Sequence, residues 1–128
     1  MGTGYLIDSN IVIGYLDDRL PKKGMSFMHL IIDDVPNISL ITKIEVLRFN
    51  APEETYRILS DFMDNSVIYD LSPQIVDRTI LLGKASKIKL PDAIIAATAL
   101  TYGFILLTRN VSDFKNIADL PVVNPYET

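Results

Sequence analysis

Residues 90–110 read LPDAIIAATALTYGFILLTRN and predict one helix followed by one buried strand. Pro91 is typical of a helix start and Gly103 of a helix end, and the apolar run FILL then predicts the strand. The helix spans about 18 Å at ~1.5 Å per residue, and the extended chain up to Thr108 returns about 16 Å at ~3.3 Å per residue. We therefore expect Asp92, in the first turn of the helix, to lie level with Thr108 at the carboxyl end of the strand.

The same alternation of strand and helix runs through the rest of the chain. Short apolar runs predict further strands at residues 5–7, 37–41, 67–69 and 122–123. Helices are expected over residues 11–16, 25–32 and 43–49, from Pro52 onward, and from Ser72-Pro73 onward. In the helix that begins at Ser72-Pro73, the side chains expected to face the core are those of Ile75, Val76, Ile80 and Leu81. Residues 17–24 are expected to form a polar loop. This order predicts an α/β fold with three layers, α/β/α, around a central twisted, mainly parallel sheet of four to five strands.

The composition limits both the architecture and the chemistry. The 128 residues are expected to form a single domain over 1–128, and 48% of them are hydrophobic, which is enough for a core. There is no cysteine and only one histidine, His29, so thiolate sites, cysteine nucleophiles and multi-histidine zinc sites are excluded within one chain. The net charge of −4 counts against a simple nucleic-acid-binding module, but less against an enzyme that binds divalent cations.

The cellular location is predicted from the absence of patterns typical of secretion signals and membrane-spanning helices. The first eight residues contain no basic region of the kind that opens a secretion signal. The longest uncharged stretch, residues 93–108, is shorter than the ~20 residues that a spanning helix needs. We expect a cytoplasmic protein with no membrane contact.

Acidic residues follow the predicted strands, at the edge of a parallel sheet where binding sites form. They are Asp8, Glu45, Asp92 and Asp113. Each also has a purely structural interpretation. Asp8 or Asp113 could cap a helix or turn. Glu45 could complete a capping box with Thr42, and Asp92 could interact with the helix dipole.

The four acids together point to a divalent metal site. Carboxylates that face one another without cations repel, and some of them would be forced to protonate. Oxygen ligands suit Mg²⁺, with Mn²⁺ as a substitute, and these ions would remove the penalty. The chemistry that matches such a site is phosphodiester hydrolysis by metal-activated water.

Four stretches resemble the motifs of the PIN-domain family, most closely its VapC-type toxin branch. They are YLIDSNI at residues 5–11, TKIEV at 42–46, LPDAIIAATA at 90–99 and LTRNVSDF at 107–114. Each stretch alone is weakly specific, but all four occur in order and span essentially the whole chain. The resemblance implies a PIN-like fold and a Mg²⁺-dependent endoribonuclease toxin of a type II toxin-antitoxin system. It also implies an RNA substrate, a homodimer and a VapB-like antitoxin, whose inhibitory segment often presents basic residues to the acidic pocket.

The resemblance also assigns roles to the acids. It makes Asp8, Glu45 and Asp92 catalytic and metal-binding residues. The fourth position stays open: either Asp113 completes the set, or Asn110 serves as a neutral ligand or positions water. The number of metal ions, one or two, stays open as well.

Other side chains near the acids are expected to assist them. Ser9, Asn10, Thr108 and Asn110 are expected to orient the acids or the substrate. Arg109, Lys87 and Lys89 are candidates for contacts to RNA phosphates, with a solvated surface as the alternative.

Two other functions remain compatible with the same acids. One is a metal-dependent phosphatase or DNA nuclease. The other is a non-catalytic PIN-like binding module whose acidic pocket receives a basic peptide or an RNA-bound partner.

Overall fold

The computed structural model describes residues 4–127 and contains a five-stranded sheet in which all strands are parallel. The strands are β1 (Tyr5–Ile7), β2 (Asn37–Ser39), β3 (Val67–Tyr69), β4 (Ile105–Leu107) and β5 (Val122–Val123), in the order β3-β2-β1-β4-β5. The chain moves outward from β1 to β3 and then returns to the other side of β1 to form β4 and β5. The predicted α/β class and parallel sheet are confirmed, and the point where the strand order reverses lies between β1 and β4.

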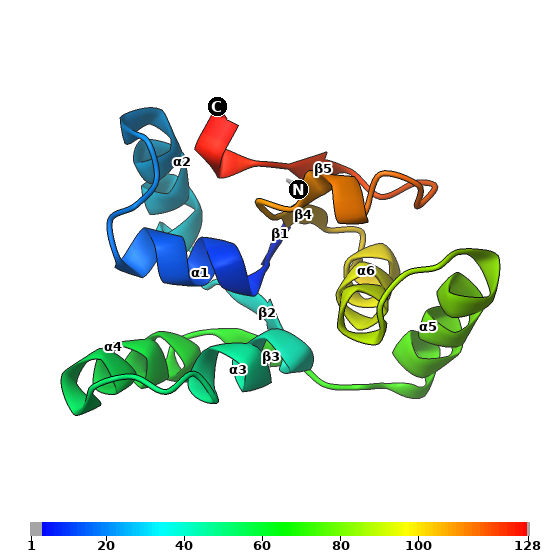
Figure 1. Ribbon diagram of the computed structural model, residues 1–128, viewed down its shortest axis with the longest axis horizontal. Coiled ribbons are helices and arrows are strands. Elements are labelled where there is room, and N and C mark those ends of the chain that lie inside the picture. The colour runs from blue at the N-terminus through cyan, green and yellow to red at the C-terminus, as the bar shows by residue number, and fades with distance from the viewer. Residues whose placement is uncertain (1–3, 128) are drawn as a thin grey trace.

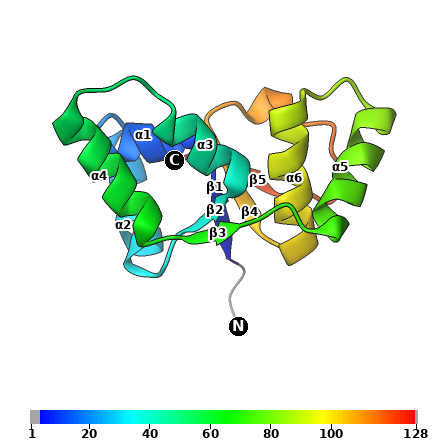
Figure 2. The ribbon, with the colours of Figure 1, turned by 90° about the horizontal axis from the view of Figure 1, so that it is seen from below.

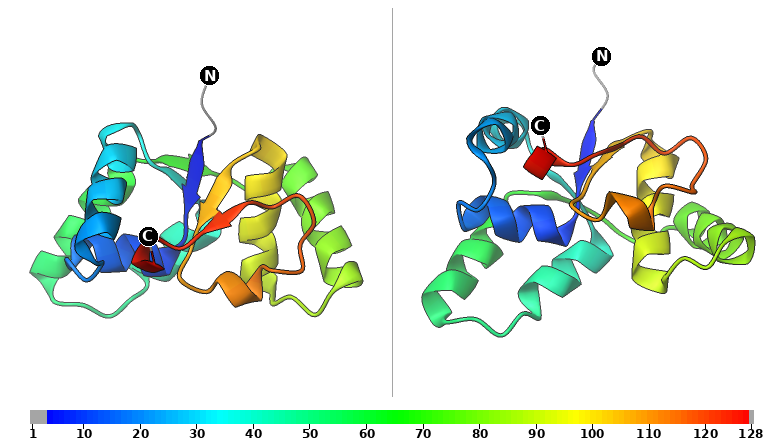
Figure 3. Two further views of the ribbon diagram at one scale, coloured as in Figure 1. Left: turned by 90° about the horizontal axis from the view of Figure 1, so that it is seen from above. Right: turned by 45° about the horizontal axis from the view of Figure 1, so that its top comes forward.

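Six helices flank the sheet (Figures 1 and 2). They are α1 (Ser9–Leu16), α2 (Lys22–Asp33), α3 (Leu40–Leu47), α4 (Glu53–Asp64), α5 (Pro73–Ala85) and α6 (Leu90–Tyr102). Helices α1, α2 and α4 lie on one side of the strands, α5 and α6 lie on the other, and α3 contacts helices of both sides. Two short 3-10 turns follow, η1 (Val111–Asp113) and η2 (Pro125–Glu127), and η2 packs beside α2 (Figure 3). The three-layer arrangement is as predicted.

The alternation of side chains along the central strands divides the core into two clusters. Ile7 and Leu107 face α1, α2 and α4, whereas Leu6 and Leu106 face α6. On α6 the sheet-facing residues Ala96 and Ala99 have small side chains, which lets this helix approach the sheet closely. All of these residues are fully buried, so the strands that end at the candidate site are held firmly from both sides.

The second strand is shorter than predicted. It ends at Ser39, whose hydroxyl caps α3 by accepting a 3.3 Å hydrogen bond from the backbone N–H of Ile41. The apolar pair Leu40 and Ile41 continues the strand pattern but belongs to the helix. Thr42 therefore lies inside α3, and the predicted capping box with Glu45 is wrong.

Two further differences concern the helices. Helix α2 begins at Lys22, within the predicted polar loop, because Gly24 does not break it. A side chain at Gly24 would collide with the backbone of Pro125, so this glycine permits close packing. On α5 only Ile75 of the four residues expected inward is fully buried, whereas Ile80 and Leu81 are 51% and 65% exposed. In residues 4–127 no helix has the length and apolar character needed to cross a membrane.

Candidate active site

Asp8 directly follows β1, at the point where the strand order reverses. Its backbone N–H donates to the carbonyl of Leu107 at 2.9 Å, which continues the β1–β4 pairing. Its carboxylate Oδ1 accepts from the N–H of Ser9 at 2.8 Å, so Asp8 caps α1. The capping interpretation is confirmed, but it occupies only one carboxylate oxygen.

The second oxygen of Asp8 belongs to a polar network that the neighbouring strand supplies. The hydroxyl of Thr108 donates to Asp8 Oδ2 at 2.8 Å, and the Asn10 amide nitrogen lies 3.4 Å from the same oxygen. Burial raises the pKa of Asp8, and the hydrogen bonds from Thr108, Ser9 and Asn10 oppose this rise. The result is a buried carboxylate with a fixed orientation.

Glu45 lies on α3 and reaches the same region. The Ser9 hydroxyl donates to Glu45 Oε1 at 3.4 Å, so Ser9 links the first two acids. Burial raises the pKa of Glu45, and the negative charges of Asp8 and Asp92 raise it further. Glu45 is therefore within electrostatic reach of both aspartates.

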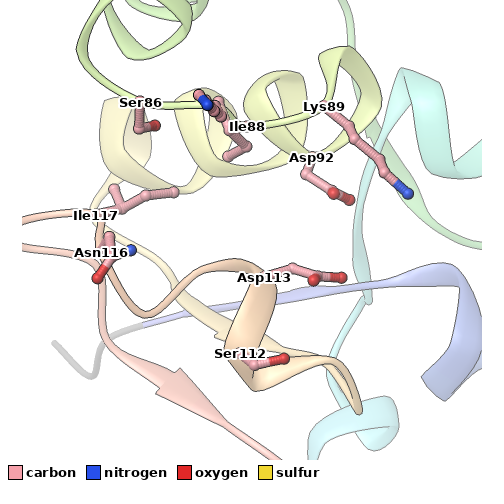
Figure 4. Close-up of a pocket in the computed structure, with 9 residues that line it drawn as sticks. Ser86, Ile88, Lys89, Asp92, Ser112, Asp113, Asn116 and Ile117 are labelled. Carbon is pink, nitrogen blue, oxygen red and sulfur yellow. The ribbon is translucent and has the colours of Figure 1, made fainter.

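Asp92 and Asp113 complete the acidic cluster. Asp92 is in the first turn of α6, and Asp113 is the last residue of η1. Burial raises the pKa of Asp92, followed by the charges of Asp113 and Asp8, and Lys89 opposes the rise. Asp92 and Asp113 project from two segments into the same space (Figure 4). The structure thus brings Asp8, Glu45, Asp92 and Asp113 to one edge of the sheet, where each acts electrostatically on at least one of the others. The lengths of α6 and β4 predicted this place for Asp92.

Asn110 and Asp113, the two candidates for the fourth position, differ in their surroundings. Asn110 joins the network through its backbone, whose N–H donates to the Thr108 hydroxyl at 3.1 Å. Asp113 raises the pKa of both Asp8 and Asp92 through its charge. Asn110 occupies the N-cap position of η1, and no side chain makes a capping hydrogen bond there. Capping of this turn therefore does not account for Asp113, which is the last residue of η1.

The predicted phosphate-contacting residues fall into two groups. Lys87 and Lys89 line a pocket of about 260 Å³ together with Asp92 and Asp113. Arg109 instead stacks its guanidinium 4.4 Å from the ring centroid of Tyr126.

The backbone of Arg109 is tied into the network from both sides. Its N–H donates to Asn10 Oδ1 at 3.0 Å, and its carbonyl accepts from the Asn124 side chain at 3.5 Å. Asn124 and Tyr126 were not among the predicted site residues. Asn124 directly follows the predicted strand 122–123, the same signal that identified Asp8, whereas no local pattern indicates the stacking of Tyr126.

The donor set suits a hard divalent cation in chemical type. All four acids offer oxygen, and their mutual repulsion is the kind that Mg²⁺ or Mn²⁺ relieves. Within the described residues 4–127, no three acidic or histidine side chains are close enough to surround one ion as they stand. The fit therefore rests on donor chemistry and on convergence of the acids.

Residues 5–120 match the family model of the PIN domain. A search of the curated proteins found no significant match.

Several solved structures have the same fold. A toxin-antitoxin complex from Klebsiella pneumoniae contains a chain that is 32% identical, with a TM-score of 0.76, and the match covers 98% of this chain and 100% of that one. A chain of VapBC-1 from nontypeable Haemophilus influenzae is 24% identical, with a TM-score of 0.78 and coverage of 94% and 97%. A chain of DNA-bound VapBC from Salmonella typhimurium is 21% identical, with a TM-score of 0.79 and coverage of 97% and 99%.

Proposed function

Because this chain belongs to the PIN domain family, we propose that it is a Mg²⁺-dependent endoribonuclease toxin of the VapC type, which a cognate antitoxin inhibits. The observation that carries the proposal is the convergence of Asp8, Glu45, Asp92 and Asp113 at the carboxyl edge of the sheet. A structural role accounts for Asp8 as a helix cap, but no such role accounts for all four acids in one place.

The proposed metal ligands are Asp8, Glu45 and Asp92, with Asp113 as the fourth acid. We prefer Asp113 to Asn110 because its charge acts on both Asp8 and Asp92. A bound Mg²⁺ or Mn²⁺ ion would neutralise the acids, lower the pKa of a coordinated water and stabilise charge on the phosphodiester.

The protein's own groups position the acids for this chemistry. Thr108 and Ser9 hold the two oxygens of Asp8, which fixes the direction of its remaining lone pairs. Ser9 also holds Glu45 through its hydroxyl. Glu45, held in this way beside the other acids, is suited to hold the metal ion or to orient the attacking water.

The proposed substrate is RNA, bound through its phosphates. The protein carries a net charge of −4, so general attraction does not bring an RNA strand to it. Local cations must do so, and Lys87 and Lys89 line the pocket that contains Asp92 and Asp113. Arg109 is the third cation proposed to contact RNA phosphates. Its guanidinium lies over the Tyr126 ring, and its backbone directly follows Thr108.

The proposed partners are an antitoxin and a second copy of the chain. The chain from the Klebsiella pneumoniae toxin-antitoxin complex is similar over almost the whole length of this one, which supports an antitoxin partner. A basic inhibitory segment would suit the acidic cluster, because each arginine or lysine would offset part of the repulsion among the acids. The homodimer rests on family resemblance.

The test is cleavage of a mixed RNA panel by purified protein in Mg²⁺, in Mn²⁺ and in EDTA. Asp92→Asn removes one proposed ligand, and Asp77→Asn, at an exposed position on α5, is the matched control. We expect metal-dependent cleavage by the wild type and the control, and none by Asp92→Asn. A duplex DNA and a phosphomonoester in the panel separate RNA cleavage from the other hydrolases.

Two results contradict the proposal. Equal cleavage by Asp92→Asn and the wild type would mean a misplaced site or a contaminating ribonuclease. Absence of cleavage, with tight and Mg²⁺-independent binding of an arginine-rich peptide, would support the non-catalytic binding module instead.

A further inference from the structure

The pocket beside the acidic cluster extends away from the proposed metal ligands. The loop 86–89 and the first turn of α6 form one wall, and residues 112–117 form the other. Asp92 and Asp113 lie toward one end, and Asn116 and Ile117 lie toward the opposite end (Figure 4). A molecule that reaches the acids can therefore extend into this pocket along the protein surface.

The size of the pocket limits what it can hold. Its volume is about 260 Å³, just below the ~300–1,000 Å³ typical of sites for drug-sized ligands. One unpaired base of a nucleic acid strand is a group of suitable size.

The walls of the pocket can contact a planar base both on its faces and along its edge. Ile88 and Ile117, both half-buried, supply apolar surface. The side chains of Ser112 and Asn116 are exposed and line the pocket, so their donors and acceptors are available to a ligand. The amide of Asn116 can both donate and accept, which suits the edge of a base.

The charges at the pocket fit a strand that carries phosphates. Lys87 and Lys89 flank Ile88 in the extended loop between α5 and α6. Each base of an RNA strand has a phosphate on either side, and lysines are suitable contacts for them. Lys87 and Lys89 share this pocket with Asp92 and Asp113, so the phosphates on either side of a bound base would pass these cations beside the acids. An RNA strand is the occupant that the proposed function supplies.

We infer that this pocket binds one unpaired base of the RNA substrate, next to the phosphate that is cleaved, and that Asn116 selects the base through hydrogen bonds to its edge. The inference rests on the proposed function, because it needs RNA at the acidic cluster. It adds a source of sequence preference, which metal-binding acids alone do not provide.

The test is the sequence preference of cleavage in a pool of single-stranded RNAs with randomised positions. The wild type is compared with Asn116→Asp, which replaces the amide donor with an acceptor at nearly constant size. Asn50→Asp, at an exposed position between α3 and α4, makes the same chemical change away from the pocket and is the control. Thermal unfolding of all three proteins verifies that they fold.

We expect the wild type and Asn50→Asp to share a base preference at one position beside the cut. In Asn116→Asp the relative kcat/KM for two bases at that position should change by about tenfold or more, since hydrogen bonds to base edges give discrimination of that order. An unchanged preference in a folded Asn116→Asp protein would overturn the inference and leave the proposed function standing.

The two failures are distinguishable. If the wild type cleaves no RNA in the pool, the proposed function fails and this inference fails with it. If the preference is unchanged but Asn116→Asp alters the binding of an arginine-rich peptide, the pocket belongs to a protein partner and not to RNA.

Discussion

The hydroxyl of Thr108 donates a 2.8 Å hydrogen bond to the carboxylate of Asp8, although the two residues are 100 positions apart in the chain. They are neighbours because β1 and β4 pair in parallel with Ile7 opposite Leu107, so the residues that follow each strand lie side by side. Thr108 has no exposed surface. The sheet itself therefore sets the orientation of the first acid.

Thr108→Val should lower RNA cleavage by about 10–100-fold, as loss of a group that orients a metal ligand commonly does. The hydrogen bond from Thr108 lowers the pKa of Asp8, whereas burial raises it. Its removal should shift the pKa of Asp8 further upward. The acid limb of the plot of kcat/KM against pH should then move to higher pH.

Thr98→Val is the matched control for this experiment. Thr98 is equally buried, but its hydroxyl donates to the carbonyl of Ile94 within α6 and not to an acid. A similar loss of activity and the same pH shift in both variants would mean that Thr108 contributes only to packing.

Local patterns predicted the position of two acids correctly. Asp8 follows a short apolar strand directly, and the lengths of α6 and β4 return Asp92 to the level of Thr108. Both arguments use only chain geometry. The capping box of Thr42 and Glu45 failed because Ser39, three residues earlier, offers an equally good cap and lies where the strand actually ends.

Contacts made by tertiary packing could not be predicted in this way. The stacking of Arg109 on Tyr126 depends on β5 pairing with β4 and on η2 packing beside α2. The base pocket depends on the separation between the loop 86–89 and η1. Neither the stacking nor the pocket produces a periodic pattern in the sequence, because each is formed by segments that are far apart in the chain.

Thr42→Val should stabilise the protein, in contrast to Thr108→Val. Thr42 has no exposed surface, and its hydroxyl is the one buried side-chain group in residues 4–127 without a hydrogen-bond partner. An unsatisfied buried polar group costs roughly 1–3 kcal/mol, and valine removes it at similar volume. We expect the free energy of unfolding, measured in urea, to rise by about 1 kcal/mol. A decrease would show that an ordered water satisfies this hydroxyl.

Gly14→Ala should destabilise the protein by about 1–3 kcal/mol, the usual range for overpacking. An added Cβ would collide with the hydroxyl of Tyr126, the residue that supports Arg109. The second change Tyr126→Phe removes this hydroxyl and should restore part of the loss. Thermal unfolding of the single and double variants measures both effects.

Gly83→Ala is the control for the helix position. Gly83 lies within α5, and a Cβ there would meet nothing within 4 Å. Alanine is the better helix former by roughly 0.5–1 kcal/mol, so this substitution should raise the unfolding temperature. If both alanine variants are equally stable, the packing of Tyr126 on α1 is looser than the structure shows.

Removal of divalent metal should expose the repulsion among the acids as a dependence of stability on pH. Burial raises the pKa of Asp92, and the charges of Asp113 and Asp8 raise it further. A group whose folded-state pKa is raised contributes stability that is fully present below its unfolded value, 3.8, and is lost as the pH rises through the folded-state value. In EDTA the wild type should therefore lose this contribution on going from pH 4 to pH 7.

Asp92→Asn isolates this contribution because its amide does not ionise. In EDTA at pH 7 the variant should unfold at a higher temperature than the wild type, and the difference should shrink toward pH 4. Mg²⁺ should raise the unfolding temperature of the wild type at pH 7 more than that of the variant, since an ion that binds the folded state stabilises it by mass action. Asp77→Asn, exposed on α5, controls for the loss of one charge.

If Asp92→Asn were the less stable protein in EDTA at pH 7, the favourable interaction of Asp92 with the α6 dipole would outweigh the repulsion among the acids. The acids would then not form the strained cluster that a divalent ion relieves.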